Sequence, residues 1–128
     1  MDATTNDRSS LYERLGGEEA LQAAVGIFYD KIMADPQLAP FFDQLDMRAQ
    51  IQKQVAFMAY AFGGPAEYKG RDLRSSHRRL VKRGLSDLHF DAVAAHLQAT
   101  LQELNVPPEL IAESLGLVGS LRNEVLDR

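Results

Sequence analysis

The three histidines of this 128-residue chain lie in different sequence environments. His77 alone falls on an apolar stripe, with Leu80 and Val81 three and four residues further on, a spacing that places all three on the inner face of a helix. His89 falls in the first turn and His96 on the flank of another predicted helix, so we expect both to face solvent. A lone inward histidine is most often a core imidazole bonded to a carbonyl, and only the surrounding sequence can favour another role.

Metal chemistry is restricted by the residue types present. The chain has no cysteine, which excludes disulfides, thiolate metal sites, iron-sulfur clusters and cysteine nucleophiles. A zinc site needs about four ligands, and with no second inward histidine these could come only from carboxylates. Haem iron needs less from the protein, because the porphyrin supplies four nitrogens and one imidazole in an apolar slot suffices. One inward histidine therefore fits haem better than zinc.

The aromatic residues are concentrated in one part of the chain, since eight of the ten fall between positions 28 and 68. Ordinary core packing also produces such clusters. Within this stretch Gln50, Lys53, Gln54 and Phe57 share one helical face at i, i+3, i+4 and i+7. That polar face is either solvated or directs amide donors toward a bound anionic or polarised small ligand. Because Phe57 continues the row, we favour a ligand pocket.

The candidate site residues are expected to lie on helices. Apolar residues recur at helical spacing through almost the whole chain, and no long segment shows the alternation of apolar and polar residues that is typical of a strand. The predicted fold class is all-α. Capping and breaking residues set the limits, from the Ser10 and Glu13 capping box to the breaks at Gly16-Gly17, Asp35-Pro36, Gly63-Gly64 and Gly84. The predicted helices span about 11–15, 18–34, 46–62, 73–84, 87–104 and 107–125.

For the last two helices the sequence predicts the extent of one apolar stripe and the continuity of one helix. The apolar stripe of the helix over 87–104 runs from Phe90 to Leu104. The last helix, opened by Pro107 and Pro108, is expected to continue as one helix with its stripe reaching Val125.

Length and composition predict a single domain over 10–128, preceded by a disordered polar tail over 1–9 without signal or transit features. A net charge of -4 gives no electrostatic drive toward nucleic acid. No apolar run reaches the roughly 20 residues needed to span a bilayer, so no membrane association is expected. The absence of cysteine suits a reducing compartment, and we expect a cytoplasmic monomer.

Six short motifs along the chain form a specific set, which comprises Tyr12 to Gly17 (YERLGG), Phe28-Tyr29, Phe41-Phe42, Phe57 to Gly64 (FMAYAFGG), Tyr68 to Arg71 (YKGR) and the segment around His77. In this order and spacing they resemble the group 1 truncated haemoglobins, including algal and cyanobacterial members, from about residue 10 onward. The resemblance implies a truncated globin, a two-over-two helical sandwich that encloses one non-covalent haem b (iron protoporphyrin IX) between the helix of Lys53 and the helix of His77.

The resemblance also implies a role for each candidate site residue. The proximal iron ligand is His77, and a distal hydrogen-bonding cluster faces it across the haem. Met58 stands where some relatives have a bulky aromatic residue that gates an apolar tunnel. The distal cluster is Tyr29, Gln50 and Gln54; the haem contacts are Phe42, Phe57 and Met58; and the candidate propionate contacts, with plain surface charge as the alternative, are Tyr68, Lys69 and Arg71.

Lys53 departs from part of the family. In similar cyanobacterial members a histidine at this position can bind the iron as a sixth ligand, whereas in other members a lysine here reaches a haem propionate. Both roles are open to Lys53. Ligation requires the neutral amine, and removing a lysine proton at pH 7 costs roughly 4 to 5 kcal/mol, which desolvation and the bond to iron would have to offset. No histidine follows His96, so the covalent link between haem and a C-terminal histidine seen in some relatives is not expected.

The function implied by the resemblance is binding of O2 and other diatomic ligands such as NO and CO. Donors from Tyr29, Gln50 and Gln54 would stabilise the partial negative charge on bound O2 and slow its release, which suits a nitric oxide dioxygenase that converts NO and O2 to nitrate. Each turnover leaves ferric iron, so an external electron donor or reductase is required. The alternatives are non-catalytic O2 binding, transport or sensing, haem electron transfer, and a cofactor-free helical interaction module in which His77 is only a core residue.

Overall fold

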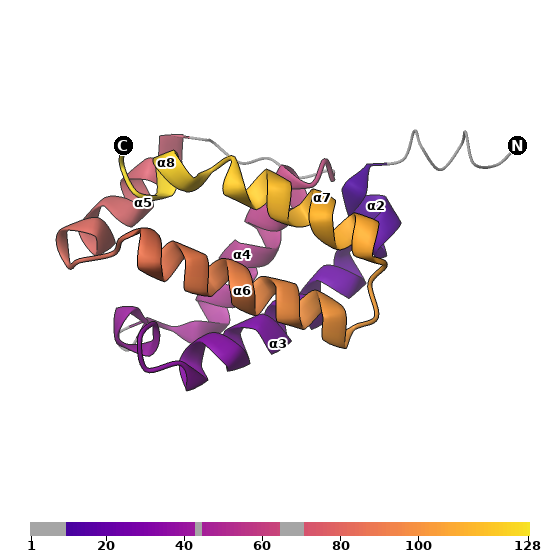
Figure 1. Ribbon diagram of the computed structural model, residues 1–128, viewed down its shortest axis with the longest axis horizontal. Helices are drawn as coiled ribbons and strands as arrows, with labels where there is room; N and C mark the ends of the chain where they lie inside the picture. The colour runs from indigo at the N-terminus through magenta and orange to yellow at the C-terminus, as the bar shows by residue number, and fades with distance from the viewer. Residues whose placement is uncertain (1–9, 43–44, 65–70) are drawn as a thin grey trace, which may run out of the picture.

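The computed structural model describes residues 10–42, 45–64 and 71–128, and the side chains of all of these except 71–76. Within these ranges every regular element is helical, which confirms the predicted fold class (Figure 1). The elements are α2 (Leu11–Leu15), α3 (Gly17–Ala34), the 3-10 helix η1 (Ala39–Phe41), α4 (Met47–Ala61), α5 (Arg71–Lys82), α6 (Asp87–Glu103), α7 (Pro108–Gly119) and α8 (Arg122–Val125).

Local sequence signals set most of these limits. Ser10 caps α2, since its hydroxyl accepts from the Glu13 amide while the Glu13 carboxylate accepts from the Ser10 amide. Gly16 ends α2 at a φ of +118°, where a Cβ would lie 2.8 Å from that of Ala20. Asp46 caps α4 by accepting from the amides of the next turn.

The second glycine pair allows a close approach between α2 and the end of α4. A Cβ on Gly64 would lie 2.7 Å from the ring of Tyr12, and the Tyr12 amide donates to the Phe62 carbonyl at 2.9 Å. Glycine is therefore required at position 64 for steric reasons.

The core lies where the pair α3 and α4 packs against the pair α6 and α7. Helix α3 contacts both α4 and α6, and α2 connects α3 to α7. In Figure 1, α6 and α7 run side by side while α4 crosses behind α6. The predicted stripe of α3 is buried throughout, with Leu21, Val25, Phe28 and Ile32 all in the core. This arrangement is the two-over-two sandwich that the resemblance implied.

The structure corrects two predictions in the C-terminal half. The last helix is divided, because α7 ends at Gly119, the Ser120 hydroxyl donates to the Leu117 carbonyl at 2.6 Å, and a short α8 follows. Glycine weakens a helix, and Arg122 is held by carboxylates of α6 instead of continuing the stripe of α7. Leu104 is not in the core but caps the end of α6, with 38% of its surface exposed.

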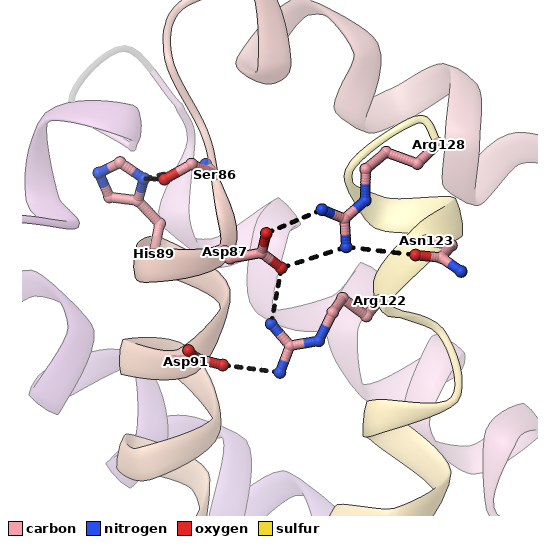
Figure 2. Close-up of polar contacts among 7 residues, drawn as sticks. All are labelled: Ser86, Asp87, His89, Asp91, Arg122, Asn123 and Arg128. Atoms are coloured by element: carbon pink, nitrogen blue, oxygen red, sulfur yellow. Dashed lines mark hydrogen bonds and ion pairs between the residues drawn. The ribbon is translucent and has the colours of Figure 1, made fainter.

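Charged contacts connect the C-terminal segment to α5 and α6. Asp87 of α6 accepts from both Arg122 and Arg128, and Arg122 also reaches Asp91 at 2.6 Å (Figure 2). Arg78 of α5 contacts Asp127 at 3.4 Å. Helix α5 packs mainly against α8. Among the described helices, none is long and apolar enough to cross a membrane.

Candidate functional site

A buried tyrosine forms the centre of a polar cluster between α3 and α4. The Tyr29 side chain is 4% exposed, and its hydroxyl accepts from Nε2 of Gln50 at 3.2 Å and donates to Oε1 of Gln54 at 3.3 Å. Gln50 and Gln54 are one helical turn apart on α4, which is why both amides reach the same hydroxyl. The structure thus brings the three predicted distal residues together.

Burial also fixes the protonation state of this cluster. Loss of water around the phenol raises the pKa of Tyr29 above its ordinary value of 10.0, and the hydrogen bond from Gln50 lowers it in part. The phenol is therefore protonated at neutral pH. A protonated hydroxyl can donate to a small polar ligand in place of Gln54, and the Gln50 amide offers a second donor.

Apolar side chains surround the cluster. Phe42 meets the ring of Tyr29 edge-on at 5.7 Å, and Phe28 packs against the same ring at 5.4 Å. Met58 is buried on α4, while Phe42 and Phe57 are only half-buried and pack against the edge of the core. A ligand bound here would be largely desolvated, which strengthens each hydrogen bond to it.

The row of residues predicted on α4 is present as a single face. Gln50, Lys53, Gln54 and Phe57 occupy successive turns of one helix, and only Lys53 among them is exposed. Lys53 therefore lies at the solvent margin of the face that holds the two half-buried glutamines.

His77 lies on α5, outside the buried core. Its side chain is half-buried, as are Leu80 and Val81 on the same face. None of the described side chains of α5 belongs to the core cluster, which is built from α2, α3, α4, α6 and α7. The amphipathic helix that carries His77 thus presents an apolar face that protein side chains only partly cover.

These observations test whether a haem fits. A haem is a flat, mostly apolar group that needs one axial imidazole and an apolar slot. The half-covered face of α5 offers the imidazole of His77, and the half-buried Phe42 and Phe57 offer apolar contacts. Among the described side chains, no three of histidine, aspartate and glutamate gather to hold a metal ion by themselves. The residues present therefore fit a haem.

The other two histidines correct the sequence prediction, because neither simply faces solvent. His96 is half-buried, and its Nε2 lies 2.7 Å from Oδ2 of Asp35 at the end of α3. Nδ1 of His89 accepts a hydrogen bond from the Ser86 amide at 3.1 Å. The His89 ring packs edge-on against the Phe41 ring, with the ring centres 5.0 Å apart. Figure 2 shows the contact between His89 and Ser86.

One contact near the site gave no signal in the sequence. Nη2 of Arg83, just after α5, donates to the Pro40 carbonyl at 3.0 Å, and the guanidinium lies 5.6 Å from the centre of the Phe41 ring. The Arg83 side chain thus connects the end of the helix that carries His77 to the turn that precedes Phe42. The partners are 43 residues apart, so no local periodicity could pair them.

The predicted propionate contacts cannot be placed. Tyr68 and Lys69 lie outside the described residues, as does the proposed tail over 1–9. Arg71 begins α5, and its side chain lies outside the described part as well.

The fold and this site can now be compared with known proteins. The family model described as "Bacterial-like globin" matches residues 10–127. A group 1 truncated haemoglobin of Chlamydomonas moewusii is 51% identical over 118 residues, which are 92% of this chain and 68% of that protein. One from Synechocystis is 47% identical over 113 residues, which are 88% of this chain and 91% of that protein.

The fold similarity is equally extensive. The 2/2 haemoglobin from Synechococcus, whose crystal structure in the cyanomet state has covalently attached haem, superposes with a TM-score of 0.89 at 50% identity, and the match covers 94% of this chain and 100% of that one. The ferric truncated haemoglobin from Tetrahymena pyriformis superposes with a TM-score of 0.85 at 39% identity, covering 92% of this chain and 98% of that one.

An all-helical two-over-two sandwich, with a half-buried histidine on α5 and a buried tyrosine between α3 and α4, is the arrangement of a truncated globin. The chain belongs to the bacterial-like globins and, among them, to the group 1 truncated haemoglobins. It is therefore a haem globin that binds diatomic ligands.

Proposed function

We propose that this protein binds one haem b non-covalently through His77 and acts as a nitric oxide dioxygenase. The observation that carries the proposal is the triad of the buried Tyr29 and the half-buried Gln50 and Gln54, which supplies two donors in an apolar setting. When bound, the haem supplies a redox-active iron that binds O2. Non-covalent binding is supported by the absence of histidine from residues 97–128.

The triad performs the discriminating step in this proposal. The Tyr29 hydroxyl turns from Gln54 toward the polarised diatomic ligand, while the Gln50 amide holds the phenol oxygen in place. Because the donors are fixed before the ligand arrives, little reorganisation is needed, and the stabilised oxygenated protein persists long enough to meet NO. Phe42 and Met58 keep bulk water from the ligand.

The conversion of NO and O2 to nitrate requires one electron from outside the protein. One NO and one O2 combine with one electron to give one nitrate ion, and the electron returns the iron to its ferrous state for the next cycle. A single globin domain has no second redox centre, so we propose a separate reductase or electron-donor protein as a partner.

Stopped-flow mixing of the oxygenated protein with NO and a reductant tests this activity. We expect catalytic nitrate formation over many turnovers. Slow or merely stoichiometric nitrate formation would contradict the dioxygenase proposal and favour O2 binding, transport or sensing. Tyr29→Phe with Gln54→Leu should shorten the lifetime of the oxygenated form, whereas Tyr60→Phe, an exposed position on the same helix α4 as Gln54, should not.

An absorption spectrum tests the haem itself. Protein reconstituted with haemin should show a Soret band typical of histidine ligation, and His77→Ala should lose that signature. Absence of the band in the unmodified protein would favour the cofactor-free interaction module, in which His77 is only a core residue.

Lys53 has two proposed roles, iron ligation or pairing with a propionate. Its place at the solvent margin of the Gln50 and Gln54 face is compatible with both. Lys53→Arg separates them, because a guanidinium keeps the charge for a propionate but cannot be deprotonated to bind iron. Ligation predicts a low-spin ferric spectrum that becomes high-spin in both Lys53→Arg and Lys53→Ala. An unchanged spectrum in both variants leaves only the propionate role. Gln52→Ala, an exposed neighbour, is the control.

A further inference from the structure

The charge of this acidic protein is distributed very unevenly. Residues 69–83 hold half of its 14 basic residues and only one of its 18 acidic residues, a net charge of +6, so the remainder carries -10. This segment includes the whole of α5, the helix that carries His77. A protein whose overall charge is -4 thus presents one strongly basic element.

The described basic side chains of α5, with that of Arg83 just after it, gather on the face opposite His77. Arg78, Arg79, Lys82 and Arg83 are all exposed, and the helical hydrogen bonding continues to Arg83, whose amide donates to the Arg79 carbonyl at 3.2 Å. At 3.6 residues per turn these four positions span an arc of about 140°, centred on the side away from His77. We call these four residues the α5 basic face.

Most of the positive charge on this face is not neutralised. Elsewhere, basic residues are paired with carboxylates, as Lys31 is with Glu103 at 2.9 Å and Arg14 with Glu113 at 2.8 Å. Within the part of the chain that the structure describes, Arg78 is the one member of the α5 basic face that contacts a carboxylate, that of Asp127 at 3.4 Å, and Arg83 donates to a backbone carbonyl. Among the described residues, no carboxylate contacts Arg79 or Lys82, so these two charges are available to a partner.

An apolar side chain lies near the same end of the helix. Leu88, in the first turn of α6, is 64% exposed, more than any other large apolar side chain in the described part of the chain. It is five residues after Arg83. Transient interfaces combine a small apolar centre with a charged rim that steers association, and this end of the molecule offers both.

We propose that the α5 basic face, with Leu88, is the docking surface for an acidic electron-donor protein that reduces the haem from the His77 side. The inference rests on the proposed function, which requires one electron per turnover. A donor seated on this face is separated from the His77 imidazole by a single helix, about 10 to 12 Å in diameter. One electron passes from the donor to the ferric iron, so the donor is oxidised and the iron becomes ferrous.

The charge distribution favours a compact acidic protein over an extended polyanion. Nucleic acid or an anionic membrane extends past α5 and meets the remainder of the molecule, which carries -10. That remainder repels a long polyanion, whereas a small acidic patch can meet the basic face alone. The attraction acts over about one Debye length, so it should disappear at high salt.

Reduction kinetics test the docking surface without NO. The haem-loaded ferric protein is mixed with reduced plant-type [2Fe-2S] ferredoxin, an acidic one-electron donor, and the bimolecular rate constant is measured at low and high ionic strength. We expect Arg79→Glu and Lys82→Glu each to lower this constant about three- to tenfold at low salt, with the difference vanishing near 0.5 M salt. Binding of oxidised ferredoxin, measured by calorimetry, should weaken in parallel.

Matched controls separate docking from general effects. Arg48→Glu changes the net charge by the same amount at an exposed site on α4 and should stay within about twofold of the unmodified protein. Photoreduced deazariboflavin, a neutral small reductant, should reduce all variants equally. Equal slowing by Arg48→Glu, or a rate that does not depend on salt, overturns the proposal.

Two further outcomes are informative. Salt-dependent co-sedimentation with phosphatidylserine vesicles that is lost in Arg79→Glu, without an effect on ferredoxin, would assign the face to a membrane and overturn the protein-docking proposal. Fast, salt-dependent reduction without catalytic nitrate formation would support the docking surface while contradicting the dioxygenase proposal, so the two failures are distinguishable.

Discussion

The cluster around Tyr29 and the helix that carries His77 are held in place by different interactions. Tyr29 is 4% exposed and belongs to the buried core together with Phe28, which packs against its ring, while Gln50 and Gln54 of α4 are half-buried beside it. Helix α5 contributes no described side chain to that core and is connected to the remainder of the chain mainly through α8 and charged contacts. Core packing therefore positions the distal residues, whereas α5 is held by packing against the short helix α8 and by the exposed ion pair between Arg78 and Asp127, a type of contact that stabilises a protein little.

This difference has a consequence for how a haem would bind. The donors on the distal side are preorganised, and preorganisation reduces the entropic cost of binding a ligand. On the proximal side, the half-covered apolar face of α5 gains its missing contacts when the haem is inserted. We therefore expect the bound haem to stabilise α5 more than it stabilises α3 and α4.

Core truncation should give the largest contrast between the two regions. Ile32 on α3 is 1% exposed, and Ile32→Ala should lower the free energy of unfolding by about 2 to 5 kcal/mol, because it leaves a cavity in the core. Leu80 on α5 is half-buried, so Leu80→Ala in the haem-free protein should cost about 1 kcal/mol. Urea unfolding measures both. Equal losses would mean that α5 is packed as tightly as α3.

Removal of the imidazole that we propose as the proximal ligand should strongly weaken haem retention. We expect His77→Ala to transfer haem to an excess of apomyoglobin about 100-fold faster than the unmodified protein does, since even indirect partners of a metal ligand contribute 10- to 100-fold. Added imidazole should restore part of the spectrum. His96→Ala, a half-buried histidine on α6, is the control and should retain haem normally.

Loss of the Tyr29 hydroxyl should affect ligand release more than folding. Tyr29→Phe removes one donor to a polarised ligand, worth about 1.5 to 3 kcal/mol, so O2 should dissociate about 10- to 100-fold faster. The unfolding free energy should change by about 1 kcal/mol. Tyr12→Phe on α2 is the matched control. An unchanged O2 dissociation rate would show that Tyr29 is a core residue and not a ligand donor.

The smallest expected effect is a pH dependence at the junction of α3 and α6. The hydrogen bond with His96, followed by that from the Gln37 amide, holds the pKa of Asp35 below its ordinary value of 3.8. Because the pKa is lower in the folded state, the stabilisation is present above about pH 3.8 and is lost as pH falls through the folded value.

Thermal unfolding between pH 3 and pH 6 measures this effect. Asp35→Asn should flatten the acid side of the curve relative to the unmodified protein, and Asp30→Asn, at an exposed position on α3, should not. Identical curves for the unmodified protein and Asp35→Asn would exclude a contribution from this carboxylate.

Helix limits were largely predictable because local chemistry sets them. Ser10, Asp46 and the αL glycine at position 16 act on backbone groups within four residues of themselves, and such effects are visible in a linear sequence. The division of the last helix was not predictable. Arg122, which opens α8, meets carboxylates of α6 that are more than 30 residues away, and no local pattern connects these positions.

In the candidate site, too, the features set by local spacing were predictable and the contacts between distant elements were not. The spacing of Gln50 and Gln54 places both amides on one face of α4, and the resemblance supplied Tyr29 as their partner. The partners of His89 and His96 were missed, because Phe41 and Asp35 come from other elements and no periodicity connects them. The unequal packing of α3 and α5 was missed for the same reason.

The sequence by itself determined that the chain is all-helical, that His77 shares a helical face with Leu80 and Val81, and that half of the basic charge lies in residues 69–83. Each of these follows from residue type and local spacing. Only the tertiary structure decided that Tyr29 is buried while the described side chains of α5 remain outside the core, and that Arg79 and Lys82 have no described carboxylate partner. Burial and pairing are properties of elements brought together by folding, so they cannot be read from one segment alone.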